Sequence, residues 1–175
     1  HLDPAKKTIL IIGGSQGARS INQGILAGLD RLTNAGVQLI WQTGVAFEST
    51  AKQAAAGNAS TFVSAFIYEM DLAYAMADLV ISRAGASSVS EICLIGKASI
   101  LVPLPSAAED HQTENAKSLV SQNAAILVRD VDVKEKLITE ALAALETDLS
   151  TLEKNSLRLA KPNAAHEIAQ SILSR

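Results

Sequence analysis

Residues 79–91, LVISRAGASSVSE, place a short strand, a glycine turn and the start of a helix one after another. The apolar residues 79–81 have the pattern of a buried strand. The N-terminus of the helix that follows offers unpaired backbone N–H groups and a partial positive charge, which suit a phosphate. Gly85 lets the backbone approach such a ligand closely, and the hydroxyls of Ser87 and Ser88 add donors. The stretch therefore predicts an anion site at the end of a strand.

Glu91 follows Ser87 by four residues, so it lies on the same side of the predicted helix and points back over its first turn. A carboxylate would repel a phosphate, but it can accept two hydrogen bonds from a sugar diol such as a ribose. An anion site and a diol acceptor one turn apart indicate a nucleotide site. The alternative is structural, because residues 88–91 also fit a capping box, S-x-x-E, in which Glu91 bonds back to the backbone of Ser88.

The composition is that of an ordinary globular domain. Of the 175 residues, 48% are hydrophobic and 19% are charged, which fits one domain with a substantial core. Aromatic residues make up only 3%, and the formal net charge is −3. Nucleic-acid-binding proteins usually have a basic face or stacking aromatic side chains. We therefore expect no nucleic-acid partner.

The cysteine and histidine content predicts neither a disulfide nor a metal site. Cys93 is the only cysteine, and its apolar neighbours predict a buried thiol. His1, His111 and His166 are too widely separated for a metal-binding motif, so we expect no metal and no cofactor. No apolar run reaches the length of a membrane span and no signal peptide opens the chain, which predicts a cytoplasmic protein. A first strand that begins almost at once, without an initiator Met, predicts an excised domain or a processed fragment.

Short apolar strands alternate with helical segments along the whole chain. Six strands, each followed by a helix, predict an α/β fold with a Rossmann-like, doubly wound parallel sheet. In such sheets, ligands bind at the carboxyl ends of the strands, where the strand order reverses. The pattern predicts strands at 8–12, 37–41, 61–65, 79–81, 99–102 and 125–128, and helices at 21–34, 47–56, 72–77, 88–95, 112–121, 133–145, 151–160 and 164–173.

The first strand is followed by a glycine-rich loop, residues 13–18, GGSQGA. A dinucleotide fingerprint would need glycine at Ser15, and a Walker A loop would need a Lys-Ser/Thr pair that does not follow. The loop also matches the nucleophile elbow G-x-S-x-G, and Asp110 and His166 would complete a hydrolase triad. Against this, nothing upstream of the first strand can supply the rest of an oxyanion hole. The other interpretation is a turn whose N–H groups and Ser15 hydroxyl face a phosphate.

Two further loops follow strand ends. Residues 66–70, FIYEM, place apolar side chains where they are either core or the flanks of a flat base whose edge the backbone would hydrogen-bond. Residues 104–115 hold two prolines and then a polar cluster that opens a helix. Gln112 and Asn115 share a face of that helix, and their amides suit sugar hydroxyls and an N-acetyl group.

The chain contains four motifs in order: GGSQGA at 13–18, Phe66-Ile67 with Met70, SRAGA at 82–86 with Ser90-Glu91, and DHQTENA at 110–116. Together they resemble the C-terminal half of the MurG family, the N-acetylglucosaminyltransferases that convert lipid I to lipid II in peptidoglycan synthesis. The resemblance extends from about Lys6 to the end of the chain. It implies the GT-B fold, in which two Rossmann-like domains face each other across a cleft and the C-terminal one binds UDP-GlcNAc.

The resemblance also implies roles for single residues. Glu91 would bind the ribose diol, Ile67 would hydrogen-bond the uracil through its backbone, and Gln112, with His111 beside it, would contact the GlcNAc. Arg83 matches a common residue of the family without an assigned role. The residues implied at the diphosphate are Ser15, Gly85, Ala86, Ser87 and Ser88.

The resemblance implies that residues 1–175 form a single donor-binding domain of an inverting glycosyltransferase. The acceptor site for lipid I, the general base and the surface that contacts the membrane belong to the N-terminal domain, which this chain lacks, so we expect no catalytic residue here and no activity from the chain alone. The full-length enzyme is expected at the cytoplasmic face of the inner membrane. Two alternatives remain open: another GT-B sugar-nucleotide enzyme, such as a UDP-GlcNAc epimerase, or a serine hydrolase that uses Ser15.

Overall fold

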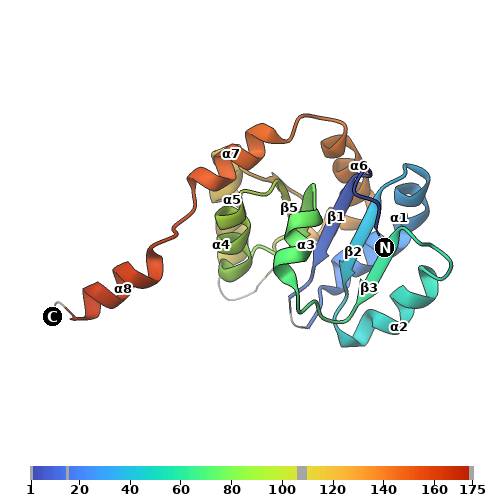
Figure 1. Cartoon of the computed structure of the whole chain (residues 1–175), viewed down its shortest axis with the longest axis horizontal. Coiled ribbons are helices and arrows are strands. Elements are labelled where there is room, and N and C mark those ends of the chain that lie inside the picture. Colours follow the sequence, from blue (N-terminus) through green and yellow to red (C-terminus); the bar gives the residue numbers. More distant parts are fainter. Residues whose placement is uncertain (1, 15, 106–109, 174–175) are drawn as a thin grey trace.

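The structure, a computed structural model, describes residues 2–14, 16–105 and 110–173. Strands and helices alternate from β1 to β6 as the apolar pattern predicts (Figure 1). The elements are β1 (Thr8–Ile12), α1 (Arg19–Asn34), β2 (Gln38–Gln42), α2 (Val45–Ala54), β3 (Thr61–Ser64), α3 (Met70–Met76), β4 (Leu79–Ser82), α4 (Ala86–Ile95), β5 (Ser99–Leu101), α5 (His111–Ser121), β6 (Ile126–Leu127), the 3₁₀ turn η1 (Asp130–Asp132), α6 (Val133–Leu145), α7 (Ser150–Arg158) and α8 (Ala164–Leu173).

The six strands form one parallel sheet in the order β3-β2-β1-β4-β5-β6. This is the doubly wound arrangement, and it confirms the predicted fold class. The chain first adds strands on one side of β1 and then returns to add β4, β5 and β6 on the other side. The order therefore reverses between β1 and β4, and the loops that leave their carboxyl ends flank the crevice where such sheets bind ligands.

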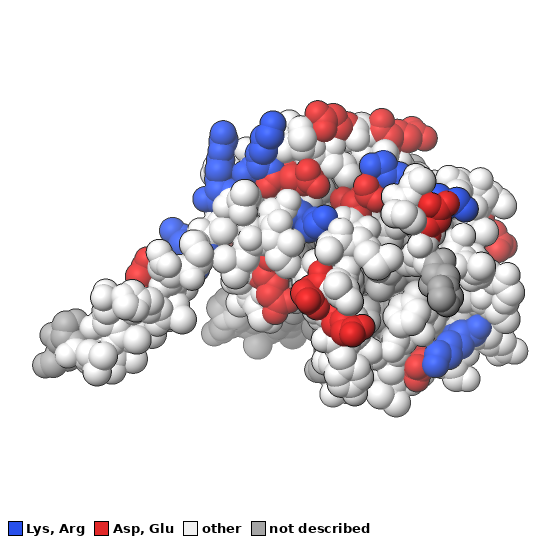
Figure 2. Space-filling view, viewed as in Figure 1, with Lys and Arg blue, Asp and Glu red and all other residues white. Residues whose placement is uncertain are grey.

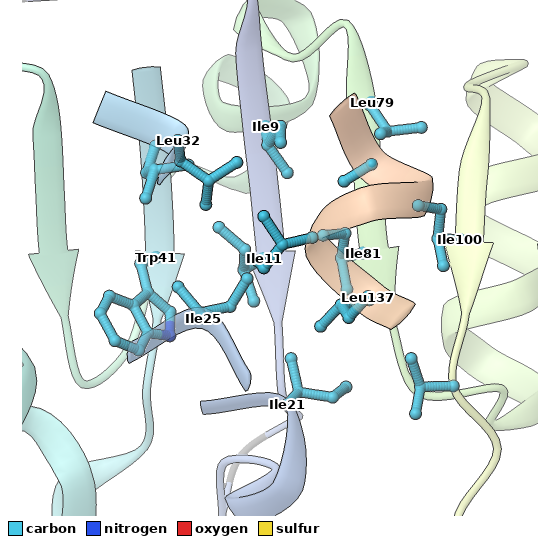
Figure 3. Packing of buried hydrophobic residues seen from close by; sticks show 14 of the residues in the cluster. Ile9, Ile11, Ile21, Ile25, Leu32, Trp41, Leu79, Ile81, Ile100 and Leu137 are labelled. Carbon is cyan, nitrogen blue, oxygen red and sulfur yellow. The ribbon is translucent and has the colours of Figure 1, made fainter. Parts of the chain in front are cut away.

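Alternate residues of β1 enter two separate cores. Ile9 and Ile11 face a cluster that also holds Ile21 and Ile25 of α1 and Leu137 of α6 (Figure 3). The neighbouring residues of β1 face a second cluster, formed with α3, α4 and α5. Since successive side chains of a strand point to opposite faces, a continuous apolar run is what a strand covered on both sides needs.

The last helix, α8, differs from the others because it projects from the body of the domain (Figure 1). No residue of α8 is buried, and Ile168, Ile172 and Leu173 are exposed. None of the helices that the structure describes is long and apolar enough to cross a membrane. On the face shown in Figure 2, acidic and basic side chains of the described residues are interspersed.

Candidate functional site

The helix that follows β4 begins two residues earlier than the sequence pattern predicts. Gly85 is the N-cap of α4 and Ala86 its first residue, and the cap has no side-chain hydrogen bond. The Val89 N–H donates to the Gly85 carbonyl over 2.9 Å, so the N–H groups of Ala86, Ser87 and Ser88 precede the first bond of the helix and lack intrahelical acceptors. The capping-box interpretation is therefore wrong, because Ser88 lies inside the helix rather than at its cap.

Gly85 is not required by the fold. Its φ of −65° and ψ of 150° are ordinary extended values that other residues adopt. A Cβ built on Gly85 meets no atom within 4 Å. The open space lies at the N-terminus of α4, at the carboxyl end of β4 beside the point where the strand order reverses. This arrangement suits a bound anion that approaches the backbone.

Glu91 is exposed one turn into α4. Its Oε2 accepts a hydrogen bond of 3.3 Å from the hydroxyl of Tyr74, which is buried in α3. Burial, and then the negative charge of Glu91 and its hydrogen bond, raise the pKa of the Tyr74 hydroxyl, so this group remains a donor at neutral pH. The sequence analysis did not identify Tyr74, which has the pattern of an ordinary core residue of a helix.

The two amide side chains of α5 contact the loops beside the helix. Oε1 of Gln112 accepts from the Leu104 N–H over 2.9 Å, and Nδ2 of Asn115 donates to the Ala84 carbonyl over 3.0 Å. Asn115 thus attaches α5 to the turn that leads into α4. His111 is the exposed first residue of α5. The structure therefore places Asn115 beside the turn before α4 and Gln112 beside the loop after β5. Among the described residues, the opposite end of each amide has no hydrogen-bond partner.

Ile67 lies in the loop between β3 and α3, and its side chain is 8% exposed. Because that side chain belongs to the core, only its main chain can face a ligand. Within the described residues, the Ile67 N–H and carbonyl form no hydrogen bond. The loop borders a hollow of about 550 Å³, which is lined by Phe62, Phe66, Ile67, Tyr68, Leu72 and Met76 among others. An apolar hollow beside open main-chain groups fits the predicted base site.

Arg83, at the carboxyl end of β4, is used within the chain. Its guanidinium donates to Asp130 Oδ1 over 2.5 Å, to Ser20 Oγ over 2.9 Å and to the Val102 carbonyl over 3.1 Å. These partners lie in η1, near the start of α1 and directly after β5. Arg83 therefore joins these three segments next to the turn that leads into α4. Sequence reasoning missed Ser20 and Asp130, for which no local motif exists.

The hydrolase alternative finds no support in the described residues. His166 lies in the projecting helix α8, where its Nε2 is 2.8 Å from Nε2 of Gln170 (Figure 1). It is therefore far from the loop that leaves β1. Ser15 lies outside the described residues, so its predicted contact with the diphosphate is untested. The loop around it packs closely, because a Cβ on Gly17, whose φ is +76°, would lie 2.1 Å from the Thr43 carbonyl oxygen.

An open helix N-terminus with a carboxylate one turn away, at the reversal point of a doubly wound sheet, is an arrangement typical of nucleotide-binding α/β domains. Residues 8–172 match the family described as the glycosyltransferase family 28 C-terminal domain. The chain belongs to this family.

Similar proteins include two curated relatives named UDP-N-acetylglucosamine--N-acetylmuramyl-(pentapeptide) pyrophosphoryl-undecaprenol N-acetylglucosamine transferase. The chain is 48% identical to the one from Phocaeicola vulgatus and 49% identical to the one from Bacteroides fragilis. Each match covers 98% of this chain and 47% of the relative, so the chain spans about half the length of these relatives. The crystal structure of Acinetobacter baumannii MurG is similar with a TM-score of 0.86 at 30% identity, over 97% of this chain and 50% of that one.

A structure of a UDP-N-acetylglucosamine 2-epimerase is also similar, with a TM-score of 0.64 at 15% identity, over 96% of this chain and 44% of that one. At this identity the likeness shows the fold alone. The inference about function therefore rests on the relatives named as transferases, not on this structure.

Proposed function

We propose that this domain binds UDP-GlcNAc as the donor half of a glycosyltransferase that transfers GlcNAc to lipid I to give lipid II. The observation that carries the proposal is the open N-terminus of α4, with Glu91 exposed one turn behind it. The N–H groups of Ala86, Ser87 and Ser88 suit a diphosphate, and the carboxylate suits a ribose diol. The names of the 48–49% identical relatives support this donor and this acceptor.

Four elements contribute to the proposed donor site. The main chain of Ile67 hydrogen-bonds the uracil, Glu91 holds the ribose, and the start of α4 and the loop that contains Ser15 face the diphosphate. Gln112, with His111 and Asn115, contacts the GlcNAc. The support for this assignment is the placement of the described residues at one edge of the sheet, and for Ser15 and His111 it is the resemblance alone.

The proposed reaction inverts the anomeric carbon, because an acceptor hydroxyl attacks it from the side opposite the departing UDP. Negative charge then grows on the diphosphate. A helix N-terminus that already points at the leaving group stabilises this charge in the transition state more than in the ground state. The lipid I site, the general base and the contact with the cytoplasmic face of the membrane are assigned to the other half of the full-length enzyme.

Calorimetric titration of the chain with UDP-GlcNAc, UDP-GalNAc and UDP tests the donor assignment. We expect UDP-GlcNAc to bind more tightly than UDP-GalNAc, because an epimer leaves polar groups of the site unpaired. Glu91→Ala should weaken the binding of UDP by about 1.5–3 kcal/mol, the range for hydrogen bonds to a charged group. Equal affinities for the two sugar nucleotides, or an unchanged affinity in a folded Glu91→Ala variant, would refute the assignment.

A further inference from the structure

We propose that Tyr74 is a positioning residue of the nucleotide site, and that its buried hydroxyl orients Glu91 toward the ribose diol. This inference rests on the proposed function of Glu91. Tyr74 itself touches no ligand in this scheme. It acts through the hydrogen bond that joins α3 to α4.

The burial of Tyr74 differs from that of Glu91. Tyr74 is 3% exposed and belongs to the cluster beneath α3, α4 and α5, so its ring is fixed by packing and its hydroxyl needs a partner. Glu91 is exposed, and an exposed glutamate ordinarily samples several rotamers. A hydrogen bond from this fixed donor to Oε2, 3.3 Å long, favours the carboxylate orientation that makes it.

The chemistry of the carboxylate leaves room for the ligand. An ionised carboxylate offers about four lone-pair sites, and Tyr74 occupies one of them on Oε2. Oε1 and the remaining site of Oε2 can then accept the two ribose hydroxyls. If Glu91 is already ordered before the ligand binds, the binding free energy does not include the entropy cost of ordering it, which is the usual benefit of preorganisation.

Tyr74 also lies close in the chain to the proposed base site. The helix α3 directly follows the loop that holds Ile67 and borders the apolar hollow proposed for the base. Tyr74 therefore connects the base loop to the ribose acceptor of α4. This connection explains why a core tyrosine, rather than a phenylalanine, is useful at this position.

The test compares the affinities of UDP and 2′,3′-dideoxy-UDP for the parent chain and for Tyr74→Phe. We expect Tyr74→Phe to bind UDP about three- to ten-fold more weakly, the range for one lost hydrogen bond, and to bind the dideoxy nucleotide within twofold of the parent. In a Glu91→Ala background, Tyr74→Phe should have no further effect on either ligand. Equal losses for both nucleotides, or an unchanged preference for UDP in folded Tyr74→Phe, would overturn the inference.

A matched control removes a comparable contact elsewhere. Thr139 of α6 accepts a hydrogen bond from Nη2 of Arg31, near the end of α1, also over 3.3 Å. Thr139→Val should change the affinities for both nucleotides by less than twofold. The control separates the loss of a link between helices from an effect at the ribose.

A second measurement needs no ligand. Side-chain three-bond couplings of Glu91, measured by NMR, should indicate one dominant rotamer in the parent chain and averaging in Tyr74→Phe. Identical couplings in the two proteins would overturn the inference even where UDP binds. If the parent chain bound no UDP, the proposed function would fail, while the couplings would still decide whether Tyr74 orients Glu91.

Discussion

Gly85 has extended backbone angles and open space where a side chain would project. A substitution there should therefore affect ligand binding without lowering the stability of the fold. Gly85→Ala should leave the free energy of unfolding unchanged or raise it by about 0.4–1 kcal/mol, because alanine reduces the entropy of the unfolded chain. The added methyl group should nevertheless obstruct a diphosphate at the start of α4. We expect UDP to bind about tenfold more weakly, as for roughly 1–3 kcal/mol of overpacking, measured by calorimetry beside urea unfolding.

Gly17 provides the opposite case for comparison. Its φ is +76°, and an added Cβ would lie 2.1 Å from the Thr43 carbonyl oxygen. Gly17→Ala should therefore lower the free energy of unfolding by at least about 1–3 kcal/mol. If Gly85→Ala instead destabilised the fold as Gly17→Ala does, or bound UDP as the parent does, the open space at Gly85 would not belong to a ligand site.

One end of the Gln112 side chain contacts the chain itself, because its Oε1 accepts a hydrogen bond from the Leu104 N–H. We propose that the other end contacts the sugar. Gln112→Ala removes the amide without adding a charge that would repel the diphosphate, and it leaves the exposed Leu104 N–H to water. We expect this variant to bind UDP-GlcNAc more weakly by about 1–3 kcal/mol, with the affinity for UDP within twofold of the parent. Titrations with both nucleotides measure the difference, and parallel losses for the two would remove Gln112 from the sugar site.

Between elements, the contacts of Arg83 join loops that are far apart in the chain. Its side chain is 13% exposed and that of Asp130 is 22% exposed. Asp130→Ala removes the carboxylate and leaves the guanidinium largely buried without its charged partner. We expect the free energy of unfolding to fall by about 1.5–3 kcal/mol, measured by urea denaturation. Lys117→Ala, which breaks an exposed pair with Glu114, should change it little, and equal effects would show that Arg83 needs no partner.

Cys93 links α4 to the pH dependence of stability. Burial raises the pKa of its thiol, and a hydrogen bond with Ser156 opposes this only in part. In the unfolded chain the thiol loses its proton above about pH 8.5, whereas the folded chain still holds it there. The free energy of unfolding is therefore unaffected by this thiol below that pH and falls as the pH rises above it. The free energy of unfolding should fall more steeply between pH 8 and 10 in the parent than in Cys93→Ala, and equal slopes would contradict the shift.

The elements follow from the sequence more directly than the contacts between them. The runs in β1 and β4 are apolar throughout, and a strand covered on both faces needs no other signal. The start of α4 is the exception. Residues 88–91 match the sequence of a capping box, but the N-cap of the helix is Gly85, three residues earlier. The pairing of Arg83 with Asp130 spans 47 residues and depends on the strand order, which an alternating pattern does not contain.

At the scale of the whole molecule, our proposal makes the carboxyl edge of the sheet one wall of the donor site. The loops that follow β1, β3, β4 and β5 all leave the parallel sheet at this edge. The chain spans about half the length of its curated relatives. A transfer reaction also needs the acceptor hydroxyl and a general base held within reach of the anomeric carbon. Our proposal assigns both to the other half of the enzyme, so binding and catalysis should be separable.

We therefore expect the chain alone to bind UDP-GlcNAc and to transfer no GlcNAc to a lipid I analogue. Binding should be weaker than in a full-length relative, because only one wall of the cleft surrounds the sugar and the energy of preorganisation is incomplete. Calorimetry measures the first quantity, and radiolabelled transfer, with a full-length relative as the positive control, measures the second. Turnover by the chain itself, abolished by Glu91→Ala and free of contaminating full-length enzyme, would place the catalytic groups within these 175 residues.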